Sequence, residues 1–215
     1  MIRIVCYGDS NTWGYDPCNG SRHDEQTRWT KRLQALLGTG YDVVECGING
    51  RTTSFDDPYR DCQNGRKGLT YCFHENKPID LLIVSLGTND LKYTNLGGAA
   101  RGLAALLRTA THSEAFDSSN KSSFRNGEIR ILVISPIALG ENLEKINPYT
   151  LFKGKREDSL HFAEAFRPIC EAYHVNFMDA AKIAVASKTD GIHMDPESHA
   201  HLADAVAEKV REILG

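Results

Sequence analysis

Short apolar runs alternate with segments of helical period along the whole chain. The apolar runs are rich in β-branched residues and have the length of buried strands: IRIVCY (2–7), DVVEC (42–46), IDLLIVSL (79–86), RILVIS (130–135) and VNFMD (175–179). Apolar side chains recur at helical spacing in RWTKRLQALL (28–37), GGAARGLAALLRTA (97–110), LHFAEAFRPICEAY (160–173) and ESHAHLADAVAEKVREIL (197–214). Strands that alternate with helices predict a parallel sheet covered on both faces.

The predicted fold class is α/β, a three-layer α/β/α sandwich around a parallel five-stranded sheet. Right-handed crossovers favour a flavodoxin-like strand order. No repeat or linker divides the 215 residues, so we expect a single domain over 1–215. Two stretches lie outside the regular pattern, a polar loop at 112–128 and a long mixed excursion at 136–158. Excursions of that length often serve as lids or interfaces.

Four polar clusters follow the predicted strands. GDSN (8–11) follows the first strand, GINGRTT (47–53) the second and GTND (87–90) the third, while DGIHMD (190–195) lies between the fifth strand and the last helix. In open α/β sheets, ligands bind beyond the carboxyl ends of the strands. We therefore expect the four clusters to meet on one rim of the sheet.

Composition narrows the classes of partner. The formal net charge is −3, and Lys and Arg form no dense cluster that could bind the phosphate backbone of a nucleic acid. Nucleic acid is therefore not an expected partner. The chain has no signal-peptide pattern and no apolar run near ~18 residues, which predicts a soluble, cytoplasmic protein without a membrane partner. The 6 cysteines form no C-x-x-C pair, and we expect reduced thiols.

The rim contains the parts of a serine acyl hydrolase. Ser10 lies in a strand-to-helix turn, where Gly8 permits a tight backbone and a helix N-terminus stabilises negative charge. A serine hydroxyl needs a base to take its proton, and His193 is the histidine whose loop reaches the same rim. Asp190 stands three residues before it, so one turn would bring its carboxylate to the imidazole. The expected catalytic residues are Ser10, Asp190 and His193.

The tetrahedral intermediate of acyl transfer also needs donors for its oxyanion. The candidates are the Ser10 N–H, the Gly50 N–H and the side-chain amide of Asn89. Each comes from the end of a different strand.

The four clusters resemble the blocks of the SGNH/GDSL hydrolase family, which supply Ser, Gly, Asn and His in this order. The resemblance spans Gly8 to His193 and implies the same triad, with Ser10, Gly50 and Asn89 as the oxyanion hole. Gly47 also lies in the second block, but the pairing of NGRTT with that block favours Gly50. Asn11 stands where the family usually has Leu. GDSNTWGYDP, GRTTSFDDP and LGTND are still more similar to a bacterial subgroup of arylesterase-type hydrolases and acyltransferases, which implies small acyl esters and a homo-oligomer.

Each motif taken alone has a simpler interpretation. Asn89 could cap a helix, DGIH could be a surface turn, and Trp13 and Tyr15 could be core residues. The conjunction of four motifs in family order favours catalysis. We expect Trp13 and Tyr15, which follow the nucleophile, and Ile192, beside His193, to line the substrate pocket.

No cofactor or metal is expected. The chain has no phosphate-binding glycine signature, and the G-x-S-x-G elbow of α/β-hydrolases is missing. HAH (199–201) suggests a metal, but residues two apart on a helix point to different sides.

The sequence therefore predicts a serine esterase that hydrolyses small, acetyl-type esters through an acyl-serine intermediate, with acyl transfer to alcohols as a further capability. A carbohydrate or antibiotic O-deacetylase of the same family shares this chemistry and is the enzymatic alternative. A binding module that has kept the rim without turnover is the alternative of another class.

Overall fold

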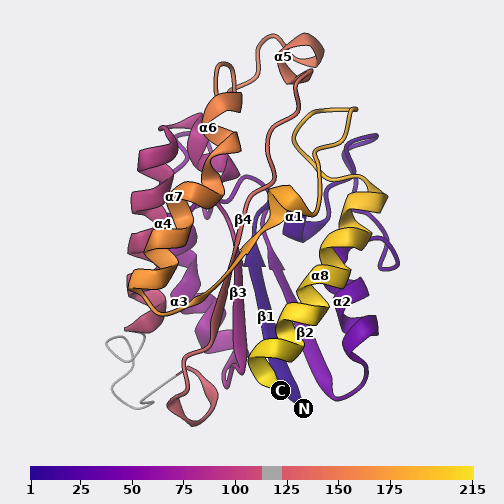
Figure 1. Ribbon diagram of the computed structural model, residues 1–215. Helices are drawn as coiled ribbons and strands as arrows, with labels where there is room; N and C mark the ends of the chain where they lie inside the picture. The colour runs from indigo at the N-terminus through magenta and orange to yellow at the C-terminus, as the bar shows by residue number, and fades with distance from the viewer. Residues whose placement is uncertain (113–122) are drawn as a thin grey trace.

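Five parallel strands form the centre of the computed structural model, which describes residues 1–112 and 123–215. The strands are β1 (Ile2–Gly8), β2 (Tyr41–Gly47), β3 (Leu81–Ser85), β4 (Ile131–Ser135) and β5 (Asn176–Asp179). Their order in the sheet is β2-β1-β3-β4-β5, and all neighbours are parallel (Figure 1). The predicted five-stranded, flavodoxin-like α/β fold is confirmed.

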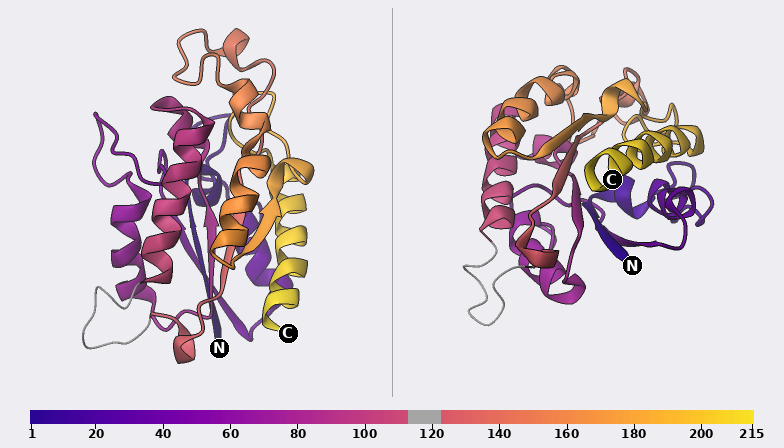
Figure 2. Two further views of the ribbon diagram at one scale, coloured as in Figure 1. Left: turned by 60° about the vertical axis from the view of Figure 1, so that its left-hand side comes forward. Right: turned by 60° about the horizontal axis from the view of Figure 1, so that its bottom comes forward.

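The helices cover both faces of the sheet, as the alternating pattern predicts. α3 (Gly65–Asn76), α4 (Leu96–Thr111) and α7 (Phe162–Ala172) lie on one face, and α2 (Trp29–Leu37) and α8 (Pro196–Leu214) on the other (Figures 1 and 2). Along β1, Val5 and Tyr7 join the core under the first group, while Ile4 and Cys6 join the core under the second. This period-two division makes the strands apolar on both faces.

The register of the sheet aligns the strand ends that carry the polar clusters. Gly8 at the end of β1 pairs with Gly47 of β2 on one side and with Ser85 of β3 on the other. The clusters that follow these residues therefore leave the sheet side by side.

Apart from the short helices of the excursion at 136–158, the helix α3 has no counterpart among the sequence predictions. α3, GRKGLTYCFHEN, contains two glycines, and its apolar side chains are not confined to one clear stripe. Gly65 begins the helix directly beneath the second polar cluster, where an added Cβ would lie 2.5 Å from the Thr52 carbonyl oxygen. Glycine has a low helix propensity, but it is needed at this helix start because a larger residue would collide with the neighbouring loop.

The excursion at 136–158 rises beyond the carboxyl ends of the strands (Figure 1). It contains the short helix α5 (Leu143–Ile146) and leads into α6 (Arg156–Leu160). Its role as a lid or an interface stays a prediction. Of the polar loop expected at 112–128, residues 113–122 lie outside the described residues. Within the two described ranges, no helix is both long and apolar enough to cross a bilayer.

Candidate active site

Ser10 is the first residue of α1 (Ser10–Trp13), directly beyond β1. The preceding Asp9 caps this short helix, because its carboxylate accepts a hydrogen bond of 3.0 Å from the Asn11 N–H. A Cβ added at Gly8 would lie 2.0 Å from Thr12 Oγ1, so only glycine fits where the chain turns from strand to helix. Because α1 has only 4 residues, its helix dipole contributes little, and the local N–H groups carry any stabilisation of an anion.

The structure brings Ser10, His193 and Asp190 into one hydrogen-bonded chain. His193 Nε2 lies 2.9 Å from Ser10 Oγ, and His193 Nδ1 lies 2.5 Å from Asp190 Oδ2. The other carboxylate oxygen of Asp190 accepts from the N–H groups of Ile192 and His193 at 2.9 and 3.0 Å. Residues 190–193 thus form the turn that the three-residue spacing requires.

The electrostatics of this chain favour an ionised Asp190. Burial by itself would raise the pKa of its carboxyl group, but the hydrogen bond and charge of His193, together with two backbone N–H groups, lower the pKa below its usual value. The carboxylate can therefore hold Nδ1 of His193 in its protonated form and leave Nε2 free to accept a proton from Ser10.

Asp9, the neighbour of Ser10, is fully enclosed. Burial raises the pKa of its carboxyl group to about 6, against the opposing effects of the Asn11 N–H and the nearby positive charges. Asp9 supports the turn through the hydrogen bond that its carboxylate accepts from the Asn11 N–H.

The loop that carries His193 is held by contacts that sequence reasoning did not find. The Asn11 side-chain oxygen accepts a 2.9 Å hydrogen bond from the Met194 N–H, and the Ser187 N–H donates to the His193 carbonyl at 2.7 Å. The ring of Tyr15 also stacks on the His193 imidazole, with centroids 4.2 Å apart and planes inclined by 30°. The departure from Leu at position 11 was the signal in the sequence, but it did not indicate a partner.

Asn89 lies in the 3₁₀ helix η1 (Thr88–Lys92) and reaches toward the second polar cluster. Its side-chain amide donates to the Arg51 carbonyl at 3.1 Å and lies 3.5 Å from Asp9 Oδ2, at the limit of a hydrogen bond. The simpler interpretation of Asn89 as a helix cap is not what the structure contains, because η1 begins after Gly87 and α4 is capped by Asn95.

The second cluster is held by side chains whose roles the sequence did not reveal. Arg51 is 5% exposed, and its Nη1 donates to the carbonyls of Gly8, at 2.9 Å, and of Cys46. Thr53 donates its N–H, at 2.9 Å, and its hydroxyl to the carboxylate of Asp90. These hydrogen bonds connect the segment after β2 to the end of β1 and to the helix η1.

The two glycines of this cluster differ in position. Gly47 ends β2, and an added Cβ would lie 2.2 Å from the Trp13 backbone nitrogen. Gly50 lies in the following turn with φ of 84°, in the left-handed region that glycine adopts without strain. Gly50 is thus the glycine of the loop, next to the Arg51 carbonyl that Asn89 contacts.

The residues expected to contact substrate are half-buried. Trp13 and Tyr15 belong to neither hydrophobic core cluster, whereas Ile192 packs against the edge of one. The guanidinium of Arg22 lies 5.5 Å from the ring centre of Trp13. Their contact with an acyl group stays a prediction.

The histidines of HAH point apart, as their spacing predicts. His199 is fully buried in α8, where burial lowers the pKa of its imidazole to about 3, while His201 is exposed. In the described part of the chain, no three ligating side chains lie together in a group that could hold a metal ion.

Solved structures are similar to this chain over its whole length. A solved carbohydrate acetylesterase family member from Sinorhizobium meliloti is 32% identical over 100% of both chains, with a TM-score of 0.88. The inhibitor-bound aryl esterase of M. smegmatis is 29% identical over 100% of both chains, also with a TM-score of 0.88. An acetylxylan esterase of Xylanibacter ruminicola is 33% identical over 96 residues, which are 44% of this chain and only 18% of that protein. The family model described as the GDSL-like lipase/acylhydrolase family matches residues 6–206, and the chain belongs to that family.

Proposed function

We propose that this protein, an ester hydrolase by its family, cleaves small acyl esters through a covalent intermediate on Ser10. The observation that carries the proposal is the hydrogen-bonded chain from Ser10 Oγ through the His193 imidazole to the Asp190 carboxylate, with contacts of 2.9 and 2.5 Å. This arrangement supplies a nucleophile, a base and a group that orients the base.

In the proposed first step, Ser10 Oγ attacks the ester carbonyl while His193 Nε2 takes the hydroxyl proton. Asp190 stabilises the imidazolium that forms, through the Nδ1 contact. The tetrahedral intermediate then collapses, and His193 returns the proton to the leaving alcohol. Water, activated by the same imidazole, releases the acid and regenerates Ser10.

The proposed oxyanion hole consists of the Ser10 N–H, the Gly50 N–H and the side chain of Asn89. The Asn89 amide has two N–H bonds; its nitrogen lies 3.5 Å from Asp9 Oδ2, only at the limit of a hydrogen bond, and donates to the Arg51 carbonyl at 3.1 Å. This fixed contact orients the amide before substrate arrives, so that the second N–H can face the developing charge without reorganisation.

Small acyl groups are proposed because two aromatic side chains follow the nucleophile in the chain and one of them contacts its base. The Tyr15 ring stacks on His193, and the ring of Trp13 lies 6.5 Å from that of Tyr15. Together with Ile192, these side chains would restrict the length of the acyl chain that can reach Ser10.

Hydrolysis of p-nitrophenyl acetate by purified protein tests the proposal. Ser10→Ala should abolish turnover, and a fluorophosphonate should add to the parent once per chain, at Ser10. Ser21→Ala, which alters an exposed loop serine, is the matched control and should keep parental activity and labelling. Full turnover by Ser10→Ala, or an adduct mapped to another residue, would overturn the assignment. A chain without any turnover would support the binding-module alternative.

A carbohydrate deacetylase is the second candidate function, and the acetylesterase relatives favour it. The chemistry at Ser10 is the same, and only the leaving alcohol differs. Parallel kcat/KM measurements on aryl acetates, acetylated xylo-oligosaccharides and acetylated antibiotics would separate the candidates. A preference for a sugar ester of at least about tenfold would favour the deacetylase.

Three finer proposals accompany this function. Free cysteines agree with a reducing cytoplasmic location, which cell fractionation would test. Acyl transfer follows if an alcohol replaces water at the acyl enzyme, and the ratio of transfer product to free acid in the presence of added alcohol measures it.

Exposed apolar side chains in the excursion, among them Tyr149 and Leu151, support a homo-oligomer, which light scattering on the purified protein would test.

A further inference from the structure

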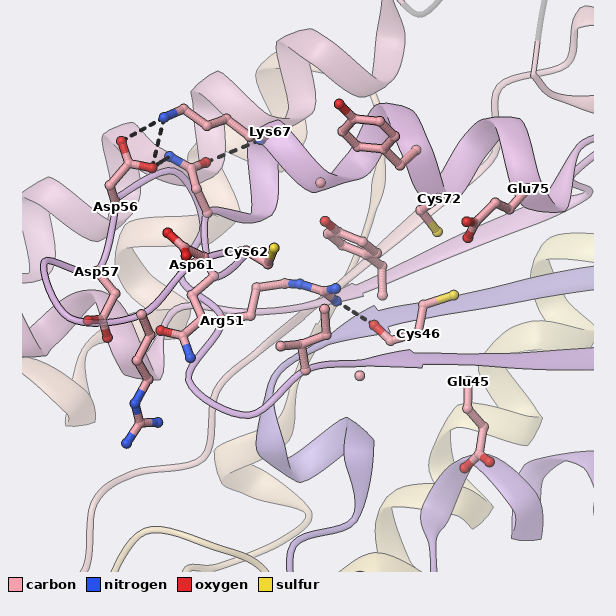
Figure 3. A pocket seen from close by; sticks show the side chains of 18 residues that line it. Glu45, Cys46, Arg51, Asp56, Asp57, Asp61, Cys62, Lys67, Cys72 and Glu75 are labelled. Carbon is pink, nitrogen blue, oxygen red and sulfur yellow. Dashed lines mark hydrogen bonds and ion pairs between the residues drawn. The ribbon is translucent and has the colours of Figure 1, made fainter.

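A second chemically distinctive place lies on the β2–α3 side of the sheet. A cavity of about 840 Å³ opens there, and neither Ser10 nor His193 lines it. Three cysteines are part of its lining, the exposed Cys62 and the more enclosed Cys46 and Cys72 (Figure 3). Cys46 comes from the end of β2 and Cys72 from the middle of α3.

The two sulfur atoms share their hydrogen-bonding partners. The side-chain amide of Asn76 lies 3.9 Å from Cys46 Sγ and 3.8 Å from Cys72 Sγ. One amide nitrogen therefore lies within 4 Å of both sulfur atoms. The thiols are thus adjacent although they are far apart in the sequence.

The surroundings make the two thiols unequal. Cys46 is half-buried and lies beside Arg51, which donates to its carbonyl, whereas Cys72 is buried. The neighbouring Cys72 side chain and the charge of Arg51 lower the pKa of the Cys46 thiol, while the contact with Cys46 and burial raise the pKa of the Cys72 thiol. Cys46 is therefore the more accessible thiol and the better nucleophile, and Cys72 is the thiol placed to follow it.

We propose that Cys46 and Cys72 form an oxidisable dithiol that a hydroperoxide converts to an intramolecular disulfide. The Cys46 thiolate attacks hydrogen peroxide, the O–O bond breaks, and Cys46 becomes a sulfenic acid with release of hydroxide. Cys72 then loses its proton to that hydroxide and attacks the Cys46 sulfur, which expels a second hydroxide; this hydroxide takes up the proton that the Cys46 thiol released to solvent when it ionised. In total, two thiols lose two electrons and two protons, and one peroxide becomes two waters.

The bond would join an edge strand to the helix beside it. β2 is one of the two edge strands of the sheet, and it is followed by the segment that carries Gly50 and Arg51. Because a disulfide holds its sulfurs about 2.05 Å apart, the two thiols must move closer when they react. In reducing compartments, disulfides of this kind are transient and respond to oxidants.

Peroxide treatment of the purified full-length chain, followed by alkylation and peptide mapping, tests the proposal. The expected product has lost two hydrogen atoms, contains one cross-link between the peptides of Cys46 and Cys72, and returns to the dithiol with dithiothreitol. Cys46→Ser and Cys72→Ser should each lose the cross-link. Cys18→Ser, which alters an exposed cysteine, is the matched control and should retain it.

Mapping of the parent protein decides the matter even if a serine variant fails to fold. Stable sulfinic or sulfonic acid at Cys46, unreacted Cys46 beside oxidised Cys18, or a cross-link from Cys46 to Cys62 would overturn the proposal. Ser10→Ala should form the Cys46–Cys72 bond as readily as the parent. The result is therefore independent of the proposed esterase activity.

Discussion

The side-chain oxygen of Asn11 accepts a 2.9 Å hydrogen bond from the backbone N–H of Met194. This bond connects the turn that presents Ser10 to the loop that presents His193. Asn11 touches none of the reacting groups in the proposed mechanism, so we regard it as a positioning residue.

Asn11→Leu keeps the size of the side chain and removes the acceptor. Because a hydrogen bond of this kind contributes about 1 kcal/mol, we expect kcat to fall roughly fivefold to tenfold with little change in KM. Asn11→Asp retains an acceptor oxygen and should recover most of the loss. Steady-state kinetics with thermal melts would measure this, and a lower Tm at unchanged kcat would show that the contact is only structural.

Asn89→Ala tests the proposed oxyanion hole. An interaction made only in the transition state should lower kcat by about 10² to 10³ and leave KM nearly unchanged. The lost bond to the Arg51 carbonyl should also reduce stability by about 1 kcal/mol, which melts would separate from the kinetic effect. Asn89→Asp places an acceptor where a donor is needed and should be at least as inactive. Turnover near the parental rate in that variant would exclude the role.

Trp13→Ala tests the acyl pocket. If the half-buried indole limits acyl length, its removal should shift preference from acetyl toward longer esters. A methylene in an apolar pocket is worth about 1 to 3 kcal/mol, so the shift should be graded along a p-nitrophenyl ester series. Tyr59→Ala, at a tyrosine that is 88% exposed, is the control and should keep the parental profile. Identical profiles for all three proteins would assign Trp13 a packing role.

The burial of Asp90 leads us to expect that the stability of the protein depends on pH. Burial, opposed by its bonds to Thr53, raises the pKa of its carboxyl group to about 7, whereas an unfolded Asp titrates near about 3.9. Between these values the folded chain holds a proton that the unfolded chain has lost, so its contribution to the free energy of unfolding decreases as pH rises.

The difference in unfolding free energy between the parent and Asp90→Asn should therefore fall from about pH 4 to about pH 8. One pKa unit corresponds to about 1.4 kcal/mol, and the fall should be at least that large. Chemical denaturation across this range measures it. A difference that is independent of pH would mean that Asp90 is ionised throughout.

Activity should survive exhaustive treatment with EDTA. The proposed mechanism uses side-chain and backbone groups for every proton transfer and charge. Residual p-nitrophenyl acetate hydrolysis after chelation and gel filtration measures the effect. Strong loss that Zn²⁺ or Mn²⁺ restores would count against the mechanism.

Local patterns determined much of this protein. The alternation of apolar runs with helix-period segments was sufficient to predict β1 to β5, α2, α4, α7 and α8, because burial of a strand or a helix face imposes a period on the sequence. The position of the polar clusters after the predicted strands indicated that they would meet on one rim of the sheet. The spacing of Asp190 and His193 is also local, since one turn of chain brings their side chains together.

Tertiary structure decided the contacts between segments distant in the sequence. The approach of Ser10 to His193, the bond from Asn11 to Met194 and the burial of Arg51 each depend on how irregular loops pack at the rim. The helix α3 was not predicted for the same reason. Its first residue is a glycine because a side chain there would collide with the Thr52 carbonyl, which lies outside the local pattern of the helix. A side-chain period reports which face of a segment is buried, but loop dihedrals and hydrogen bonds between segments follow from the packed fold, which no local period encodes.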